Sequence, residues 1–218
     1  MEVSTFELLV KPIAPRAILP ANLQVVARRV VQGYFLTVSN LEDRDIKCRI
    51  EFFISLPDDP NSPDAANRLI ENNATIAVDV AGTNQFITPT RDGTTNRYFG
   101  EFDLPAGKTA SVELLPILTE TVLANPEPQI EIRGYVELFV VINNPPIRRA
   151  SVLLNPETRG TFLPNDFPAN TNTSDIDFDQ INYTLAIASG KALNLLTPVF
   201  ESMISDLTTS RQLVESVN

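Results

Sequence analysis

The sequence predicts a mainly β protein: an antiparallel immunoglobulin-like β-sandwich of about eight to ten strands, followed by a C-terminal amphipathic α-helix. Two long segments, residues 46–56 and 130–142, alternate apolar and polar side chains as strands do. The 17 prolines and 8 glycines are spread along the chain, which indicates many short elements joined by turns. Little helical periodicity occurs before residue 190. Together these observations favour a sandwich.

The first elements are short strands. Residues 3–10 place Phe6, Leu8 and Val10 inward against Thr5 and Glu7, and prolines then end the strand. Residues 23–31 fit either a strand or a short helix, and we favour a strand. Residues 34–38 and 46–56 are separated by a short polar loop rich in Asn and Asp, which predicts that the two segments pair antiparallel.

The segment 46–56 carries the clearest alternation in the chain. One parity is apolar and the other, apart from Phe53, is polar: Lys47, Arg49, Glu51 and Ser55. This pattern predicts a strand with one buried face and one face in water. Cys48, the only cysteine, lies on the apolar parity and is predicted to be a small buried hydrophobe, and no intramolecular disulfide is possible.

The middle of the chain continues with turn-punctuated strands. We predict a surface loop over residues 57–64 and a helical turn after Asp64. Further strands are expected at residues 75–80, 85–88, 98–104, 110–114, 150–154 and 161–163.

The segment 130–142 differs from the earlier long strand in its second face. That face begins polar and ends apolar, with Phe139 and Val141. A strand end that is apolar on both faces needs cover on both, either from another part of this chain or from another subunit. Phe139 and Val141 are therefore candidate partner-binding residues.

The composition shifts after residue 164, so we divide the chain into a β-sandwich domain (1–164) and a C-terminal region (165–218). That region is expected to hold a connection, an extra strand at 181–187, and a helix that opens at Thr197-Pro198. The helix stripe contains Phe200, Ile204 and Leu207, which we add to the partner-binding candidates. The helix packs either on its own sandwich or on a second subunit.

The charge balance bounds the partners. The chain has 27 acidic and 17 basic residues and a net charge of -10, so its average field repels phosphate backbones and anionic lipids. We expect no nucleic-acid partner and no membrane partner. The first residues show no signal peptide and no apolar run is long enough to span a bilayer, which favours a cytoplasmic protein.

The sequence contains few of the residue types and motifs that are typical of enzymes. Histidine is absent, as are phosphate-binding glycine loops, so we do not expect an enzyme. One acidic pattern is a candidate Ca²⁺ site, namely Asp175, Asp177 and Asp179. It lacks the Gly and bidentate Glu of an EF-hand loop, and an edge strand with its aspartates in water explains the spacing equally. We expect no other cofactor.

These observations lead to two hypotheses from different classes. The first is a non-catalytic interaction or structural protein that presents a sheet face or edge to a protein partner or to a second copy. The alternative is a ligand-binding module, for carbohydrate or a Ca²⁺-dependent ligand, that uses loops at one end of the sandwich. The four tyrosines are too dispersed in the sequence to predict a sugar platform, and we expect each to pack in the core or on a sheet face.

Overall fold

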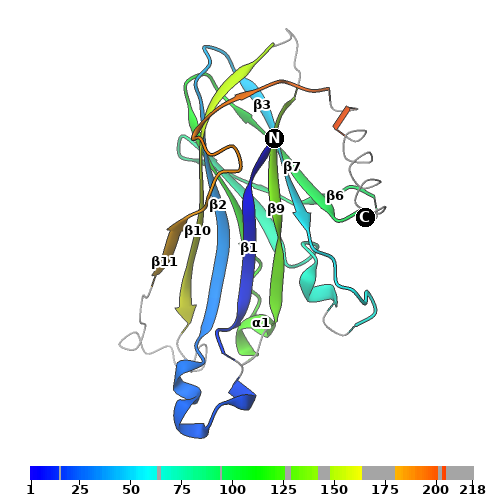
Figure 1. The fold of residues 1–218 in the computed structure, drawn as a ribbon, viewed down its shortest axis with the longest axis vertical. Helices are drawn as coiled ribbons and strands as arrows, with labels where there is room; N and C mark the ends of the chain where they lie inside the picture. Colours follow the sequence, from blue (N-terminus) through cyan, green and yellow to red (C-terminus); the bar gives the residue numbers. More distant parts are fainter. Residues whose placement is uncertain are drawn as a thin grey trace.

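The computed structural model describes residues 1–14, 16–62, 65–93, 95–125, 129–141, 148–163, 180–200 and 203–204. These residues form a mainly β, antiparallel fold in which 12 strands belong to one sheet (Figure 1). The strands are β1 Glu2–Pro12, β2 Arg29–Asn40, β3 Ile46–Ile54, β4 Ala74–Val80, β5 Thr83–Ile87, β6 Thr90–Arg91, β7 Arg97–Leu104, β8 Thr109–Pro116, β9 Ile130–Val141, β10 Ala150–Leu163, β11 Gln180–Thr184 and β12 Leu193–Leu196. The helices are short: α1 Glu120–Ala124, and 3₁₀ turns at Arg16–Ile18, Ala21–Val26 and Ala65–Arg68.

The sheet branches at β2. One edge of β2 pairs with β10 along its whole length, while the opposite edge pairs first with β1, over residues 29–32, and then with β8, over 34–39. Gly33 lies at the change of partner, where an added Cβ would come 2.9 Å from the Leu114 carbonyl oxygen. Glycine is needed here because no side chain fits between the diverging strands. Two wings result: β1-β9-β3-β7-β6, and β8-β4-β5.

The sheet curls into a half-barrel, so the two wings face each other across the core. The rings of Phe6, Tyr34 and Phe52, one from each of β1, β2 and β3, meet edge to face with centroids 5.4–6.2 Å apart. An added Cβ on Gly100 of β7 would lie 2.8 Å from the Ile76 side chain of β4. The prediction of a mainly β, antiparallel protein is confirmed, whereas the immunoglobulin-like sandwich type is not, since the described strands form one continuous sheet.

Two local predictions are wrong. Strands β2 and β3 do not pair, because both edges of β2 are taken by β10, β1 and β8, and β3 instead pairs with β7 and β9. The loop between β2 and β3 therefore crosses from one wing to the other. The strand predicted at 23–31 begins only at Arg29, and residues 21–26 form a 3₁₀ helix in the long β1–β2 connection.

The prediction that the second face of β3 lies in water is also wrong. Arg49 is 4% exposed and Glu51 is 0% exposed. This face is covered: Arg49 lies over the Phe99 ring of β7, 3.6 Å from its centroid. The side chain of Ile204, from the C-terminal region, is also fully buried, and the Ile204 carbonyl accepts a hydrogen bond from Arg97 of β7. Cys48 is buried, as predicted.

The described part of the C-terminal region continues the same sheet. Strand β11 confirms the predicted strand near residues 181–187, and β12 follows it; both pair with β10. Residues 197–200 are extended, and Val199 forms a parallel bridge with Val141, so no helix opens at Thr197. Met203 and Ile204 are helical, and the rest of the predicted helix lies outside the described residues.

Candidate functional site

An open strand edge is the first component of the site. Strand β1 pairs with β9 from Glu2 to Val10, but on its other side it pairs with β2 only from Leu9 onward. The Ile13 amide bonds to the Arg28 carbonyl, and the Glu7 carbonyl accepts from the Gln32 side chain, so odd-numbered residues direct their peptide groups away from β9. Within the part of the chain that the structure describes, no strand pairs with that side of β1 between Ser4 and Leu8, so the Thr5 peptide groups and the Glu7 amide face an open edge.

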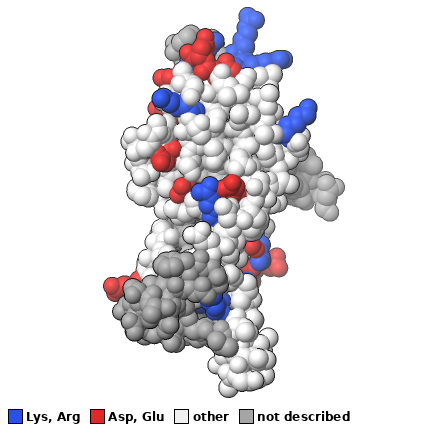
Figure 2. All heavy atoms as spheres, turned by 90° about the vertical axis from the view of Figure 1, so that its left-hand side faces the viewer, with Lys and Arg blue, Asp and Glu red and all other residues white. Residues whose placement is uncertain are grey.

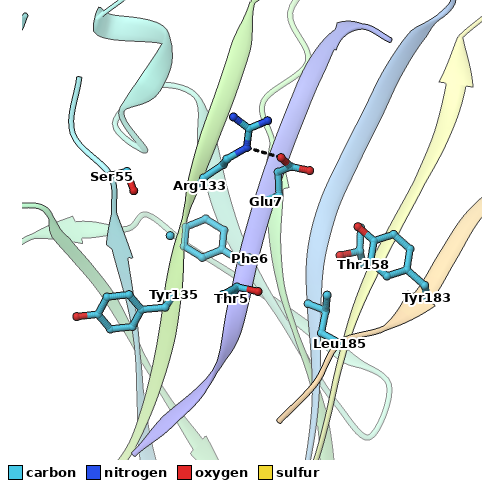
Figure 3. A pocket seen from close by; sticks show the side chains of 10 residues that line it. Thr5, Phe6, Glu7, Ser55, Arg133, Tyr135, Thr158, Tyr183 and Leu185 are labelled. Carbon is cyan, nitrogen blue, oxygen red and sulfur yellow. Dashed lines mark hydrogen bonds and ion pairs between the residues drawn. The ribbon is translucent and has the colours of Figure 1, made fainter. Parts of the chain in front are cut away.

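A groove runs along this open edge (Figure 3). Its larger part has a volume of about 530 Å³, and an adjoining hollow of about 300 Å³ shares Thr5 and Tyr135 with it. One wall comes from β1 and β9, and the other from β10, β11 and the segment after β11. The residues that line the larger part are Thr5, Phe6, Glu7, Ser55, Arg133, Gly134, Tyr135, Thr158, Tyr183 and Leu185. We name this feature the β1 groove.

Paired charges occupy one end of the β1 groove. The Arg133 guanidinium donates to the Glu7 carboxylate and also pairs with Glu131, to which Lys11 donates at 2.8 Å. Hydrogen bonding to Glu7 is the main reason that the pKa of Arg133 is raised. Burial acts to raise the pKa of Glu131, but the hydrogen bond and charge of Lys11, with Arg133, outweigh it and hold that pKa below its usual value. Each of the two shifts favours the charged form of its group, as expected for side chains that are paired with opposite charges.

Two tyrosines flank the groove. Tyr135 stacks on Phe53, with ring centroids 4.7 Å apart and planes 3° apart, so its ring is held flat. Tyr183 of β11 lies opposite Thr158 of β10 and is 47% exposed. The prediction that each tyrosine packs in the core or on a sheet face is confirmed for Tyr34 and Tyr98, which are fully buried, and for Tyr135, which stacks on Phe53. Tyr183 is about half exposed, and the fold brings it and Tyr135 to one groove although they are far apart in the sequence.

The partner-binding candidates lie on a different surface, the outer face of β9 and the C-terminal region. Val141 is buried beside Val199, whose amide donates to the Val140 carbonyl at 3.0 Å, and Phe139 is half-buried. Ile204 is fully buried, while Phe200 is 56% exposed. Part of the cover that this strand end needs thus comes from its own chain. Leu207 lies outside the described residues.

The candidate metal ligands Asp175, Asp177 and Asp179 also lie outside the described residues. Among the residues that the structure does describe, no group of three or more His, Cys, Asp or Glu side chains is arranged to hold a metal ion.

Sequence reasoning missed a buried charge cluster beneath the C-terminal region, formed by Arg49, Glu51, Arg97 and Glu137. Each of the four is at most 4% exposed. The Arg49 Nε lies 2.6 Å from Glu51 Oε1, and an Arg97 nitrogen lies 3.3 Å from Glu51 Oε2. Burial raises the pKa of the Glu51 carboxyl, the two arginines lower it, and Glu137, its cross-strand neighbour, raises it again. The arrangement neutralises charge and encloses no described cavity.

Comparison with known proteins adds no family: no protein-family model matches the chain, and no curated protein matches its sequence. Functional inference therefore depends on the β1 groove itself. Its chemistry is that of binding, since it offers unpaired peptide groups, tyrosine rings and a fixed ion-pair network.

Proposed function

We propose that this protein is a non-catalytic interaction protein, located in the cytoplasm, that binds an extended segment of a partner protein in the β1 groove. The partner segment adds to β1 as a strand. In this proposal the two wings of the half-barrel correspond to the two facing sheets of an immunoglobulin-like sandwich. The observation that carries the proposal is the open edge of β1, whose Thr5 and Glu7 peptide groups face a groove instead of a neighbouring strand.

Open strand edges invite pairing, because their N–H and C=O groups can continue the ladder. Exposed edges are usually blocked by proline, bulges or charges, since otherwise they promote aggregation. Here the edge of β1 faces a groove whose other wall includes Thr158 and Tyr183, so in this proposal a single extended segment enters the groove. Strand addition supplies affinity through main-chain hydrogen bonds, and side-chain pockets supply selectivity.

The walls predict which partner sequences fit best. Alternate side chains of an added strand point to opposite faces, so every second one meets the groove lining. Tyr135 and Tyr183 favour apolar or aromatic side chains at these positions, and the Glu7–Arg133 pair favours polar ones at the other end. Proline in the partner is disfavoured because it removes a ladder donor.

The test uses a pair of substitutions at Thr5 and a displayed library of random heptapeptides. Thr5→Pro removes the groove-facing amide together with the Thr5 hydroxyl and leaves the ladder to β9 intact, whereas Thr5→Val removes the hydroxyl and keeps the amide. The difference between the two variants therefore reports the amide alone. We expect the natural protein and Thr5→Val to enrich the same extended peptides, and Thr5→Pro to enrich none while melting at a similar temperature. Equal enrichment by Thr5→Pro would refute strand addition.

Amide hydrogen exchange provides a second readout that needs no partner. Phe6 and Leu8 direct their amides toward β9, so their exchange should be slow, while the Thr5 and Glu7 amides should exchange quickly. A selected peptide should slow exchange at Thr5 and Glu7 alone. Uniform protection along the free strand would show that the edge is already occupied.

A carbohydrate is the second candidate ligand, favoured by the presence of Tyr135 and Tyr183 in one groove with Thr5, Ser55 and Thr158. Sugar binding uses side chains, so Tyr183→Ala should abolish it, and Thr5→Pro should weaken it no more than Thr5→Val does, because both variants lose the Thr5 hydroxyl. A glycan array separates the two candidates. A Ca²⁺ requirement would depend on Asp175, Asp177 and Asp179, and calorimetric titration with Ca²⁺ tests it independently.

A further inference from the structure

The connection between β1 and β2 carries an unusual surface at one end of the molecule. Its described residues, 13–14 and 16–28, project with two 3₁₀ turns at one end of the long axis, the lowest part of Figure 1. Four aliphatic side chains are exposed there: Ile13 (58%), Ile18 (76%), Leu23 (45%) and Val26 (56%). We name these four residues the apolar tip.

The apolar tip is held in place by its base. The Ile13 amide bonds to the Arg28 carbonyl at 2.9 Å, and Ala27 is fully buried. Arg29 is 2% exposed and donates to the carbonyls of Leu123 and Asn125, which ties the base of the tip to α1 and the residue after it. The four aliphatic side chains are thus exposed on a loop whose base is held to the body by hydrogen bonds and a buried side chain.

Charge is depleted around the apolar tip. The chain has 27 acidic residues, yet none lies between Glu7 and Glu42. The Arg28 guanidinium turns back to the body, where it donates to the Phe162 carbonyl and lies over the Phe162 ring. Figure 2 shows the result on one face: its lowest part carries no charged side chain. The tip therefore has no acidic residue although the protein is acidic, and its loop, residues 13–14 and 16–28, contains two arginines, Arg16 and Arg28.

We propose that the apolar tip inserts into the interfacial region of a lipid bilayer, driven by transfer of aliphatic surface out of water. The tip projects, whereas sites for small ligands are concave. None of its four side chains is Trp, Tyr or Arg, the types enriched at protein interfaces, and Leu and Val are under-represented among interface hot spots. Four side chains also fall short of the area of roughly 800 Å² per partner that a stable dimer buries.

This proposal departs from the expectation that the protein has no membrane partner. That expectation came from the net charge of -10, which repels anionic headgroups. A tip without acidic residues at one end of the long axis lets the acidic body stay away from the bilayer. No helix in the described part of the chain is long and apolar enough to cross a membrane, so the proposed contact is an interfacial one.

The test is co-flotation of the full chain with phosphatidylcholine vesicles. We expect the natural protein to float with them equally at low and high salt, and less well at low salt when phosphatidylserine is added. The double variant Ile18→Asp, Leu23→Asp should lower the partition coefficient by at least about tenfold for each side chain withdrawn from lipid. Phe86→Asp is the matched control, because Phe86 is 72% exposed on β5, away from the tip. The partition coefficient of this variant should equal that of the natural protein.

Three outcomes would overturn the proposal. The first is that the natural protein floats with vesicles of no lipid composition, and the second is that Phe86→Asp loses as much flotation as the double variant does. The third is that light scattering shows an oligomer of the natural protein that the double variant Ile18→Asp, Leu23→Asp dissociates, because the tip would then be a protein interface. Unchanged melting of the double variant excludes misfolding as the cause of lost flotation. Thr5→Pro should float normally, so this test and that of the β1 groove fail independently.

Discussion

Replacing Arg97 with methionine tests the buried charge cluster most directly. The Arg97 side chain is fully buried, pairs with Glu51 at 3.3 Å and with Asp92, and donates to the Ile204 carbonyl at 3.4 Å. Removing one member of a buried ion pair costs about 3–5 kcal/mol, because the other charge stays buried without its partner. Glu51 keeps its contact with Arg49 at 2.6 Å, so we expect the low end, about 3 kcal/mol.

The loss should depend on pH. Burial already raises the pKa of Glu51, and Arg97 is one of the two cations that oppose this effect. Without Arg97 the folded-state pKa rises further. A carboxyl whose folded pKa is raised stabilises the fold below its unfolded pKa, and this stabilisation is lost as pH rises through the folded pKa. The deficit of Arg97→Met should therefore be larger at pH 7.5 than at pH 5.

Urea unfolding of the natural protein and the variant at both pH values measures the effect. Arg133→Met is the matched control: the Arg133 side chain is 52% exposed, and exposed ion pairs contribute at most about 1 kcal/mol. If Arg97→Met costs no more than Arg133→Met, or if its deficit is the same at both pH values, the account of a buried, mutually neutralised cluster is wrong.

Three further predictions concern packing. Ile204→Ala should lower the free energy of unfolding by about 2–4 kcal/mol, because Ile204 is fully buried. Met203 is 47% exposed, so Met203→Ala should lower it by under about 0.5 kcal/mol. Equally small effects of the two variants would mean that the C-terminal region does not pack on the sheet. Cys48 should resist iodoacetamide in the native protein, since burial raises the pKa of its thiol to about 12, and rapid native labelling would contradict this. Gly134→Ala should cost about 3 kcal/mol or more in urea unfolding, because its Cβ would lie 1.7 Å from a carbonyl oxygen of β3, and an unchanged midpoint would refute that close approach.

The strands and one side of the core were predictable from periodicity. Ile46, Cys48, Ile50, Phe52 and Ile54 share a parity in the sequence, and each is at most 2% exposed in the fold. Alternation is a local property that survives whatever the strand's neighbours are, which is why it predicted these positions correctly.

Burial of the second face of β3 was not predictable in this way. Arg49 and Glu51 are polar, and their burial depends on β7, β9 and the C-terminal region, the last about 150 residues away in the chain. The pairing of β2 failed for a related reason. Because β3 follows β2 in the sequence, we predicted that the two strands pair. In the fold, however, β10 pairs with one edge of β2, and β1 and β8 pair with the other.

Only one wall of the β1 groove could be predicted from the sequence. Thr5 and Glu7 fall on the outward parity of the first strand in the sequence, as the structure has them. Nothing local connects them to Tyr183, which reaches the groove only because β11 pairs with β10. A long-range strand pairing therefore determines the opposite wall of the groove.

One branch point accounts for both proposed surfaces. Because β8 takes over the edge of β2 beyond Gly33, β1 separates from β2 there, and residues 4–8 of β1 lose their neighbour on that side. The β1 groove opens along this freed edge. At the other end, β1 and β2 still pair as far as Pro12 and Arg29, so the described residues of their connection, 13–14 and 16–28, lie beyond the paired strands and carry the apolar tip. The divergence at Gly33 thus places the β1 groove and the apolar tip on the same two strands, and the two proposed partners would bind there without competing.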